Sequence, residues 1–174
     1  MMTKAQFQTP DKRLAAVCGL FCPACRLFIG THDDPQLLQN IADQRQQPIA
    51  EVQCDGCRAE RRSKYCQDCE FVRCAAEKGI DFCGQCDEYP CDELKEFQAA
   101  RPHRIELWEA QERIKAVGYE QWFREKVEHY ACPQCQTINS AYDASCRHCG
   151  ATPSCAYVGL HQAEISRALS SQQK

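Results

Sequence analysis

The segment YCQDCEFVRCAAEKGIDFCGQCDEYPCDELKEF at residues 65–97 contains the pattern C-x2-C-x4-C twice, at 66–74 and at 83–91. Two thiolates at C-x2-C spacing can leave a short turn and bind one ion at about 2.3 Å from each sulfur. We expect the last cysteine of each repeat, Cys74 or Cys91, to open a helix, because free backbone N–H groups there stabilise a thiolate. The repeat therefore predicts a fold organised around metal ions.

The same spacing recurs throughout the chain. Its 174 residues include 16 cysteines, and six of the intervals between them are C-x2-C. The first residues, MMTKAQFQTPDKRLAAV, contain no apolar run of signal-peptide length, and no later run reaches membrane-spanning length. We therefore expect a cytoplasmic protein without a membrane segment. Disulfides rarely persist in that compartment, so the cysteines are predicted to bind metal.

Charge argues against one class of partner. The formal net charge is −3, and each zinc ion held by four thiolates adds about −2. Nucleic-acid-binding proteins normally present a basic face. The only dense basic stretch, at residues 58–64, is predicted to be a solvated loop. Nucleic-acid binding is therefore not expected.

The predicted fold class is a small metal-stabilised α+β protein with short helices. Residues 1–130 are expected to form a cysteine-rich multi-zinc domain, which includes a helical connector at 102–130. A helix is predicted from the N-cap Asp34 and from Pro35 at its first position, ending before Pro48. Within the connector, Gly118 is expected to separate two amphipathic helices that pack on the first cysteine-rich body, residues 18–100.

Residues 131–155 are expected to form a zinc ribbon, and residues 156–174 a polar tail with at most a short helix at 163–169. The ribbon is predicted from CPQCQTINSAYDASCRHCG at 132–150, whose pattern is C-x2-C-x10-C-x2-C. Two such turns can hold one ion between them. The ribbon uses four cysteines and leaves Cys155 spare.

The first body holds eleven cysteines, which do not divide into four-ligand sites. A local grouping joins 54, 57, 66 and 69, then 74, 83, 86 and 91, and leaves 18, 22 and 25 incomplete; an interleaved pairing is equally allowed by the spacing. The incomplete set either recruits His32, His103, an aspartate or Cys155, or keeps an open position for chemistry. The predicted metal ligands are Cys18, Cys22, Cys25, Cys54, Cys57, Cys66, Cys69, Cys74, Cys83, Cys86, Cys91, Cys132, Cys135, Cys146 and Cys149.

Three motifs in order resemble one family. They are CGLFCPACRLFIG at 18–30, CDGCRAE at 54–60 and the segment at 65–97. Together with the helix that runs to EQWFREK, they resemble a cysteine-rich, zinc-binding prokaryotic domain of unknown function, over about residues 17–130. That domain opens with C-G-L-x-C-x-x-C and closes with C-x-x-C-x-E-Y-P-C. The resemblance implies metal binding and supplies no catalytic residue.

The function that we expect is zinc binding, with about three to four mainly structural zinc ions per chain and a surface that binds an unidentified protein partner. No catalytic residue is assigned, and enzymatic activity is not expected. One alternative is an iron–sulfur or open-site metal protein with a redox or catalytic role, because all-thiolate sites accept either element. A second alternative, a nucleic-acid-binding ribbon, has only Arg147 and His148 as basic residues of the ribbon.

Overall fold

The structure is a computed structural model that describes residues 1–171. It is mostly helical, with 58% helix. The α-helices are α1 (Arg26–His32), α2 (Pro35–Arg45), α3 (Ile49–Val52), α4 (Lys64–Gln67), α5 (Glu70–Lys78), α6 (Asp92–Ala99), α7 (Leu107–Tyr130) and α8 (Ala156–Ser171). Short 3-10 helices are η1 (Lys4–Phe7), η2 (Lys12–Leu14), η3 (Cys22–Ala24), η4 (Cys83–Gln85) and η5 (Pro102–Arg104).

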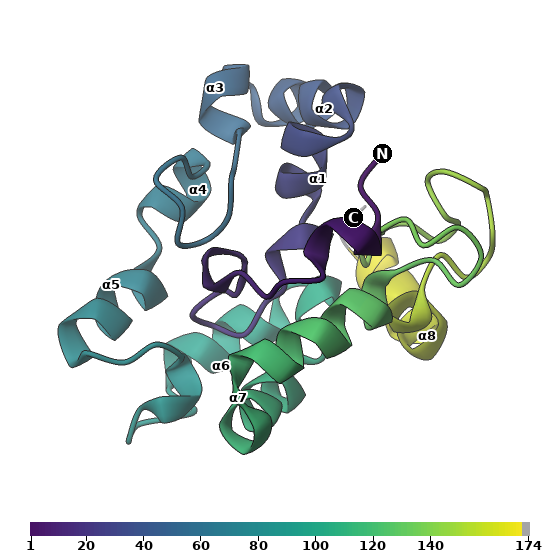
Figure 1. The fold of residues 1–174 in the computed structure, drawn as a ribbon. Helices are drawn as coiled ribbons and strands as arrows, with labels where there is room; N and C mark the ends of the chain where they lie inside the picture. The colour runs from purple at the N-terminus through teal and green to yellow at the C-terminus, as the bar shows by residue number, and fades with distance from the viewer. Residues whose placement is uncertain (172–174) are drawn as a thin grey trace.

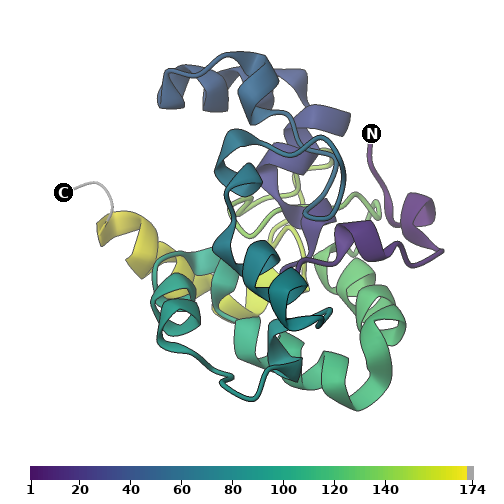
Figure 2. The same cartoon turned by 90° about the vertical axis from the view of Figure 1, so that its left-hand side faces the viewer.

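The helices lie around a central N-terminal segment. In Figure 1, α1 to α3 lie at the top, α4 and α5 descend on the left, α6 and α7 form the base, and α8 lies on the right. Figure 2, turned by 90°, again places α2 far from α7. A small core of Leu27, Leu38, Ile41, Ala42, Val52 and Cys54 lies beneath α1 to α3, and a larger one joins the N-terminal residues to α7 and α8.

Helix α2 begins where the sequence predicts. The Asp34 carboxylate accepts a hydrogen bond from Leu37 N at 2.9 Å, and Pro35 occupies the first turn. The helix ends at Arg45, before Pro48, and Gln46 follows it in the left-handed conformation (φ 52°). The predicted helix after Asp34 is therefore confirmed, and its capping residue explains where it starts.

Helix α7 bends back on itself at Gly118. This residue has φ 80° and ψ 161°, which is not helical. Arg113 Nη2 on one half lies 2.6 Å from Glu125 Oε1 on the other, so the halves run side by side. The predicted pair of amphipathic helices is confirmed, as is their packing: Trp122 and Phe123 are fully buried, and both meet Phe21 edge to face.

The predicted α+β fold with a zinc ribbon is wrong. The structure has 4% strand and no sheet over the described residues. Pairing between extended segments lasts one residue at a time, at Thr3 with Thr137, Ala15 with Phe21, and Ala131 with Ile138. The reason is local. Most of the backbone hydrogen bonds of residues 132–151 are made within tight turns, so these residues do not form the repeated pairing of a β-ladder.

Two smaller expectations also differ from the structure. Helix α5 begins after Cys69, and Cys74 lies inside it, because the first repeat turns into a helix one cysteine earlier than the second; Cys91 does precede α6, as expected. The short helix expected at 163–169 is part of the longer α8, which buries Tyr157, Val158 and Ile165. The last three residues of the expected polar tail, 172–174, lie outside the described residues.

No helix among residues 1–171 combines the length and apolar character that crossing a bilayer requires.

Candidate metal centre

Two short turns of matching geometry present four cysteines. In the first, Cys132 N donates to Thr137 O at 2.8 Å and Gln136 N donates to Cys132 O at 3.0 Å. In the second, Cys146 N donates to the carbonyl of residue 151 at 2.8 Å and Gly150 N to Cys146 O at 2.9 Å. The residue after each second cysteine has positive φ, 62° at Gln136 and 74° at Gly150. The sequence places glycine at only one of them.

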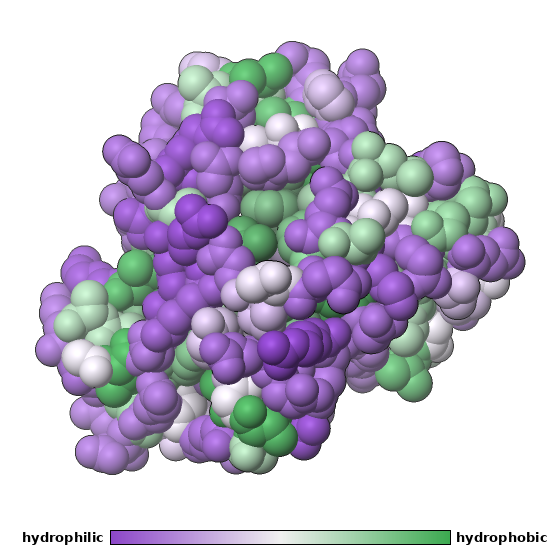
Figure 3. All heavy atoms as spheres, viewed as in Figure 1, coloured by the Kyte–Doolittle hydropathy of each residue, from purple (hydrophilic) through white to green (hydrophobic). Residues whose placement is uncertain are grey.

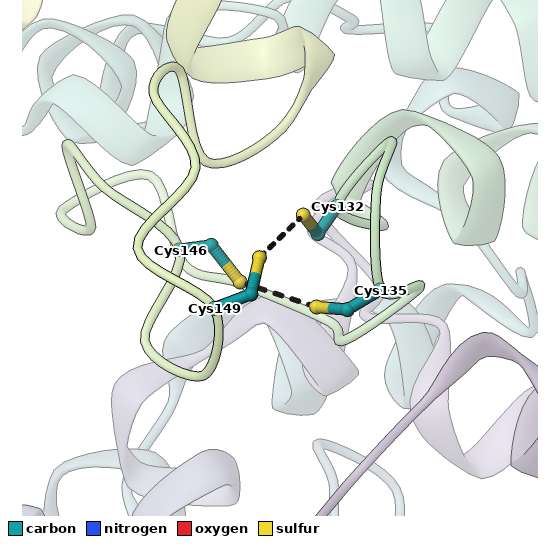
Figure 4. Close-up of side chains that lie close together, drawn as sticks. All are labelled: Cys132, Cys135, Cys146 and Cys149. Carbon is teal, nitrogen blue, oxygen red and sulfur yellow. Dashed lines mark hydrogen bonds between the residues drawn. The ribbon is translucent and has the colours of Figure 1, made fainter.

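The four sulfurs of Cys132, Cys135, Cys146 and Cys149 converge between these turns (Figure 4). All lie within 4.8 Å of one another, and the sulfurs of Cys132 and Cys149, like those of Cys135 and Cys146, are 3.6 Å apart. In a tetrahedral zinc site with sulfurs about 2.3 Å from the ion, neighbouring sulfurs are about 3.8 Å apart. These four residues, which we call the four-cysteine cluster, therefore fit a single metal ion.

Two buried polar residues support the cluster. Thr137 Oγ1 lies 3.2 Å from Cys135 Sγ, and Asn139 Nδ2 lies 3.6 Å from Cys146 Sγ. The same Asn139 amide donates to Thr137 O at 2.9 Å and to Ser154 O at 3.2 Å, while its oxygen accepts from Arg147 N at 3.1 Å. Hydrogen bonds to ligand sulfurs orient them and tune the metal. Spacing of cysteines gives no signal for either residue.

The thiols of the four-cysteine cluster differ in pKa. Burial raises the pKa of Cys135, but its hydrogen bonds with the hydroxyl and amide of Thr137 and with neighbouring thiols outweigh burial and lower that pKa to about 6. The pKa of Cys146 is also lowered, because N–H groups in its own turn and Asn139 outweigh burial. For Cys149, a backbone N–H lowers the pKa, but hydrogen bonds to the other thiols raise it to about 12. A cation bound here would displace the remaining protons.

The cluster is joined to the body by its second turn and by the start of the chain. The Arg147 guanidinium pairs with the Asp33 carboxylate at the end of α1, and Arg147 Nε donates to Ile138 O at 2.9 Å. Lys4 N donates to the carbonyl of residue 136 at 3.0 Å. The two turns of the cluster are therefore fixed to the helical body by side-chain and backbone contacts.

The other eleven predicted ligands do not form such a cluster among the described residues. Three are buried, Cys18, Cys22 and Cys54; seven are half-buried, Cys57, Cys66, Cys69, Cys74, Cys83, Cys86 and Cys91. Cys25 is exposed as a residue, although protein surrounds its thiol and the N–H groups of Leu27 and Phe28 bond to it. The structure thus brings four of the fifteen predicted ligands together within bonding range of one ion.

The candidates for an additional ligand have other partners. His32 Nε2 lies 3.1 Å from Asp55 Oδ1, and His103 Nδ1 lies 2.6 Å from Tyr142 Oη. Cys155 is buried, with the Ser154 hydroxyl 3.7 Å from its sulfur. None of these three lies in the four-cysteine cluster.

Sequence reasoning missed one charged cluster. Glu106, just before α7, pairs with Lys126, with His129 at 2.7 Å and, across to α8, with His161 at 2.9 Å. Its four members are up to 55 residues apart, so no local pattern in the sequence marks them.

Comparison with known proteins gives one match. Residues 14–96 match the model of a family described as "Protein of unknown function (DUF3795)". The matched segment includes the three motifs at 18–30, 54–60 and 65–97 except the final residue, and it excludes α7 and the four-cysteine cluster. No curated protein and no solved structure matches the chain.

Proposed function

We propose that this chain, a cysteine-rich protein with residues 14–96 in a family of unknown function, binds zinc, and that the metal is mainly structural. The observation that carries the proposal is the convergence of the four sulfurs of the four-cysteine cluster within 4.8 Å. Four thiolates close the coordination shell of one ion, and closed all-cysteine sites are characteristic of structural zinc.

The surroundings of the cluster suit a structural role. Asn139 and Thr137 are fully buried, and Cys132 is inaccessible to solvent, so water reaches the cluster from one side. Metal binding there would hold the turns at 132–137 and 146–151 together, where no sheet does so. We expect the protein to act as a cytoplasmic interaction or accessory module with a protein partner and without nucleic acid, on the grounds of its acidic charge.

Elemental analysis of anaerobically purified protein tests the metal. We expect about three to four zinc ions per chain and negligible iron, from four ligands per site. Stoichiometric iron, with visible absorption that bleaches on reduction, would instead establish the iron–sulfur alternative.

A pair of matched variants tests the site. Cys135→Ser should remove one zinc ion, because three thiolates no longer close the shell. Cys155→Ser is the control, since Cys155 is buried nearby but lies outside the cluster, and it should leave the zinc content unchanged. Equal zinc contents in C135S and the parent protein would contradict the assignment of the site.

A further inference from the structure

We infer that Arg26 and the hydroxyl group of Tyr142 form a binding site for a phosphate group, with the positive charges of Arg101 and Arg104 beside it. The site joins the start of α1, the 3-10 helix η5 and the turn at residues 140–143. It uses none of the sulfurs of the four-cysteine cluster. The inference therefore goes beyond the proposed zinc binding, because it concerns a ligand that side chains other than thiols recognise.

A tight turn fixes the position of Tyr142. Asp143 N donates to Ser140 O at 3.1 Å, Ser140 N donates to Asp143 Oδ2 at 2.8 Å, and Tyr142 N donates to Ser140 Oγ at 3.2 Å. Ser140 is buried, whereas Tyr142 is half-buried. The turn therefore presents the phenol ring at the edge of the body, where its hydroxyl meets His103 on η5.

The imidazole of His103 determines what the Tyr142 hydroxyl can do. Arg104 Nε donates a hydrogen bond to His103 Nε2 at 3.3 Å, and an arginine N–H group can only donate. Nε2 therefore carries no proton, and the single proton of the neutral ring is on Nδ1. Burial, together with Arg104 and Arg101, lowers the pKa of His103 to about 3, in agreement with a neutral ring.

The Tyr142 hydroxyl is consequently a hydrogen-bond donor to its surroundings. His103 Nδ1, which carries the ring proton, lies 2.6 Å from Tyr142 Oη, so the hydroxyl oxygen accepts this bond. Burial raises the pKa of Tyr142 above its ordinary value, although three nearby arginines lower it, so the hydroxyl keeps its own proton at neutral pH. Within residues 1–171 this hydroxyl makes no second hydrogen bond. Its hydrogen is therefore available to an acceptor from solution.

Arg26 supplies the second set of donors. Its guanidinium carbon lies 5.7 Å from the centre of the Tyr142 ring, and the residue is half-buried. Over the described part of the chain, this guanidinium forms no ion pair and no hydrogen bond. The planar fork of an arginine matches two oxygens of a phosphate group. Arg26 and Tyr142 thus present neighbouring donors that the fold itself does not use.

The charge next to these donors is positive. Arg104 is buried, and its guanidinium donates to Phe97 O at 2.7 Å and to Tyr65 Oη at 3.2 Å, so it contributes charge rather than a free N–H group. Arg101 is exposed and, like Arg104 and Arg26, lowers the pKa of Tyr142. Coulomb energy grows with the charge of the ligand, so three arginines favour a phosphate over a singly charged carboxylate.

Two carboxylates near the site have backbone partners. Asp143 Oδ2 accepts from Ser140 N at 2.8 Å, and Asp34 Oδ1 accepts from Leu37 N at 2.9 Å. Neither forms an ion pair with Arg26. Arg26 is therefore open to a ligand, while the negative charge of these carboxylates limits the affinity.

Titration of the full chain with inorganic phosphate, followed in ¹H–¹⁵N spectra, tests the site. Chloride keeps the ionic strength constant, so general screening does not change during the titration. We expect saturable shifts at the Arg26 Nε–H and at the backbone N–H of Tyr142. Acetate should bind about tenfold more weakly, because it carries less charge. Shifts that grow without saturation, or equal affinity for acetate and phosphate, would overturn the inference.

Matched variants identify the donors. Tyr142→Phe keeps the ring and removes only the hydroxyl, and Arg26→Gln removes the guanidinium charge. Each should weaken phosphate binding about tenfold, the effect of losing one charge-assisted hydrogen bond. Arg124→Gln is the control, because Arg124 is exposed on α7 and makes none of the contacts described above; it should bind phosphate like the parent protein.

An equal loss in R26Q and R124Q would mean that only the net charge matters, and the inference would be wrong. If Tyr142→Phe does not fold, the comparison of R26Q with R124Q and the titration of the unaltered chain decide the outcome.

Discussion

The side chain of Asn139 makes four hydrogen bonds, which connect the two cysteine turns with each other and with Ser154. Its side chain contacts the sulfur of Cys146, two carbonyls and the amide of Arg147 while excluded from solvent. Thr137 O and the Cys146 sulfur keep other partners when Asn139 is removed, so only part of this set is left unpaired, and an unpaired buried group costs about 1–3 kcal/mol.

Asn139→Ala should therefore lower the free energy of unfolding by about 2–3 kcal/mol. Loss of such a supporting hydrogen bond also weakens metal binding by roughly 10–100-fold. Denaturant titration and competition with a chromophoric chelator measure the two effects. Asn40→Ala is the matched control, because Asn40 is exposed and bonds only to Gln36; equal losses in both variants would contradict the role of Asn139.

At the scale of residues, spacing was sufficient to find the four cysteines of the cluster, 132, 135, 146 and 149, because two C-x2-C turns are complete in themselves. It was insufficient for Thr137 and Asn139. Their importance depends on burial and on the direction of their side chains, and a local sequence pattern carries neither. The Glu106 cluster was missed for a similar reason: its members, Glu106 included, come from three places in the chain.

Among the elements, α7 depends most on one residue. Gly118 has a backbone conformation, φ 80° and ψ 161°, that residues with a Cβ avoid at a cost of about 1–3 kcal/mol. A Cβ there would meet no atom within 4 Å, so the cost is conformational rather than steric. The return of the second half of α7 along the first therefore requires glycine.

Gly118→Ala should lower the free energy of unfolding by about 1–3 kcal/mol. Gly79→Ala is the comparison: Gly79 follows α5 with φ 65° and ψ 30°, which other residues can adopt at a smaller cost of about 1 kcal/mol. Thermal or chemical unfolding measures both. A smaller loss at residue 118 than at residue 79 would contradict the conformational argument.

The elements were predicted unevenly. Helix α2 was predicted because Asp34 and Pro35 mark its start within the sequence itself. Helix α8 was predicted too short, because Tyr157 is buried against another element and donates to Pro102 O, a contact 55 residues away. The ribbon strands were predicted from the cysteine turns by analogy, whereas here those turns pair with residues 2–4 and 131 for one residue at a time.

For the molecule as a whole, Glu106 connects both halves of α7 to α8. Burial raises the pKa of Glu106, but His129 and Lys126 outweigh burial and lower it to about 2, from 4.5. This stabilisation is complete above about pH 4.5 and is lost as the pH falls toward 2. Burial lowers the pKa of His161, but Glu164 and Glu106 raise it above 6.5. That second contribution is complete below pH 6.5 and is lost as the pH rises through the folded-state pKa.

Glu106→Gln should therefore destabilise the protein most between about pH 4.5 and 6.5, by about 2–3 kcal/mol. The difference from the parent protein should shrink on both sides of this range. Urea unfolding at about pH 3, 5.5 and 8, which lie below, within and above this range, measures the difference in the free energy of unfolding. Glu120→Gln, at an exposed position on α7, should show no such profile; a difference that is constant with pH for E106Q would contradict the ionic origin.

The face of the molecule in Figure 3 is largely hydrophilic, with hydrophobic patches that are small and separate. Among the residues whose burial the structure describes, four large apolar side chains are exposed, at Met1, Ile49, Tyr65 and Leu160, on different parts of the chain. Most of the large apolar side chains are instead buried in the two hydrophobic cores described above. The charge count from the sequence anticipates this hydrophilic surface, whereas the two-core arrangement depends on long-range contacts that only the fold supplies.

Within the four-cysteine cluster, Cys149 is exposed while Cys132 and Cys146 are buried. Exchange of a bound ion with solution would therefore begin at one sulfur, since a competing chelator or an oxidant reaches Cys149 first. The rate at which the site gives up its ion, unlike its affinity, would then be set at this single edge. A modest chemical change at Cys149 would release metal long before the buried sulfurs react.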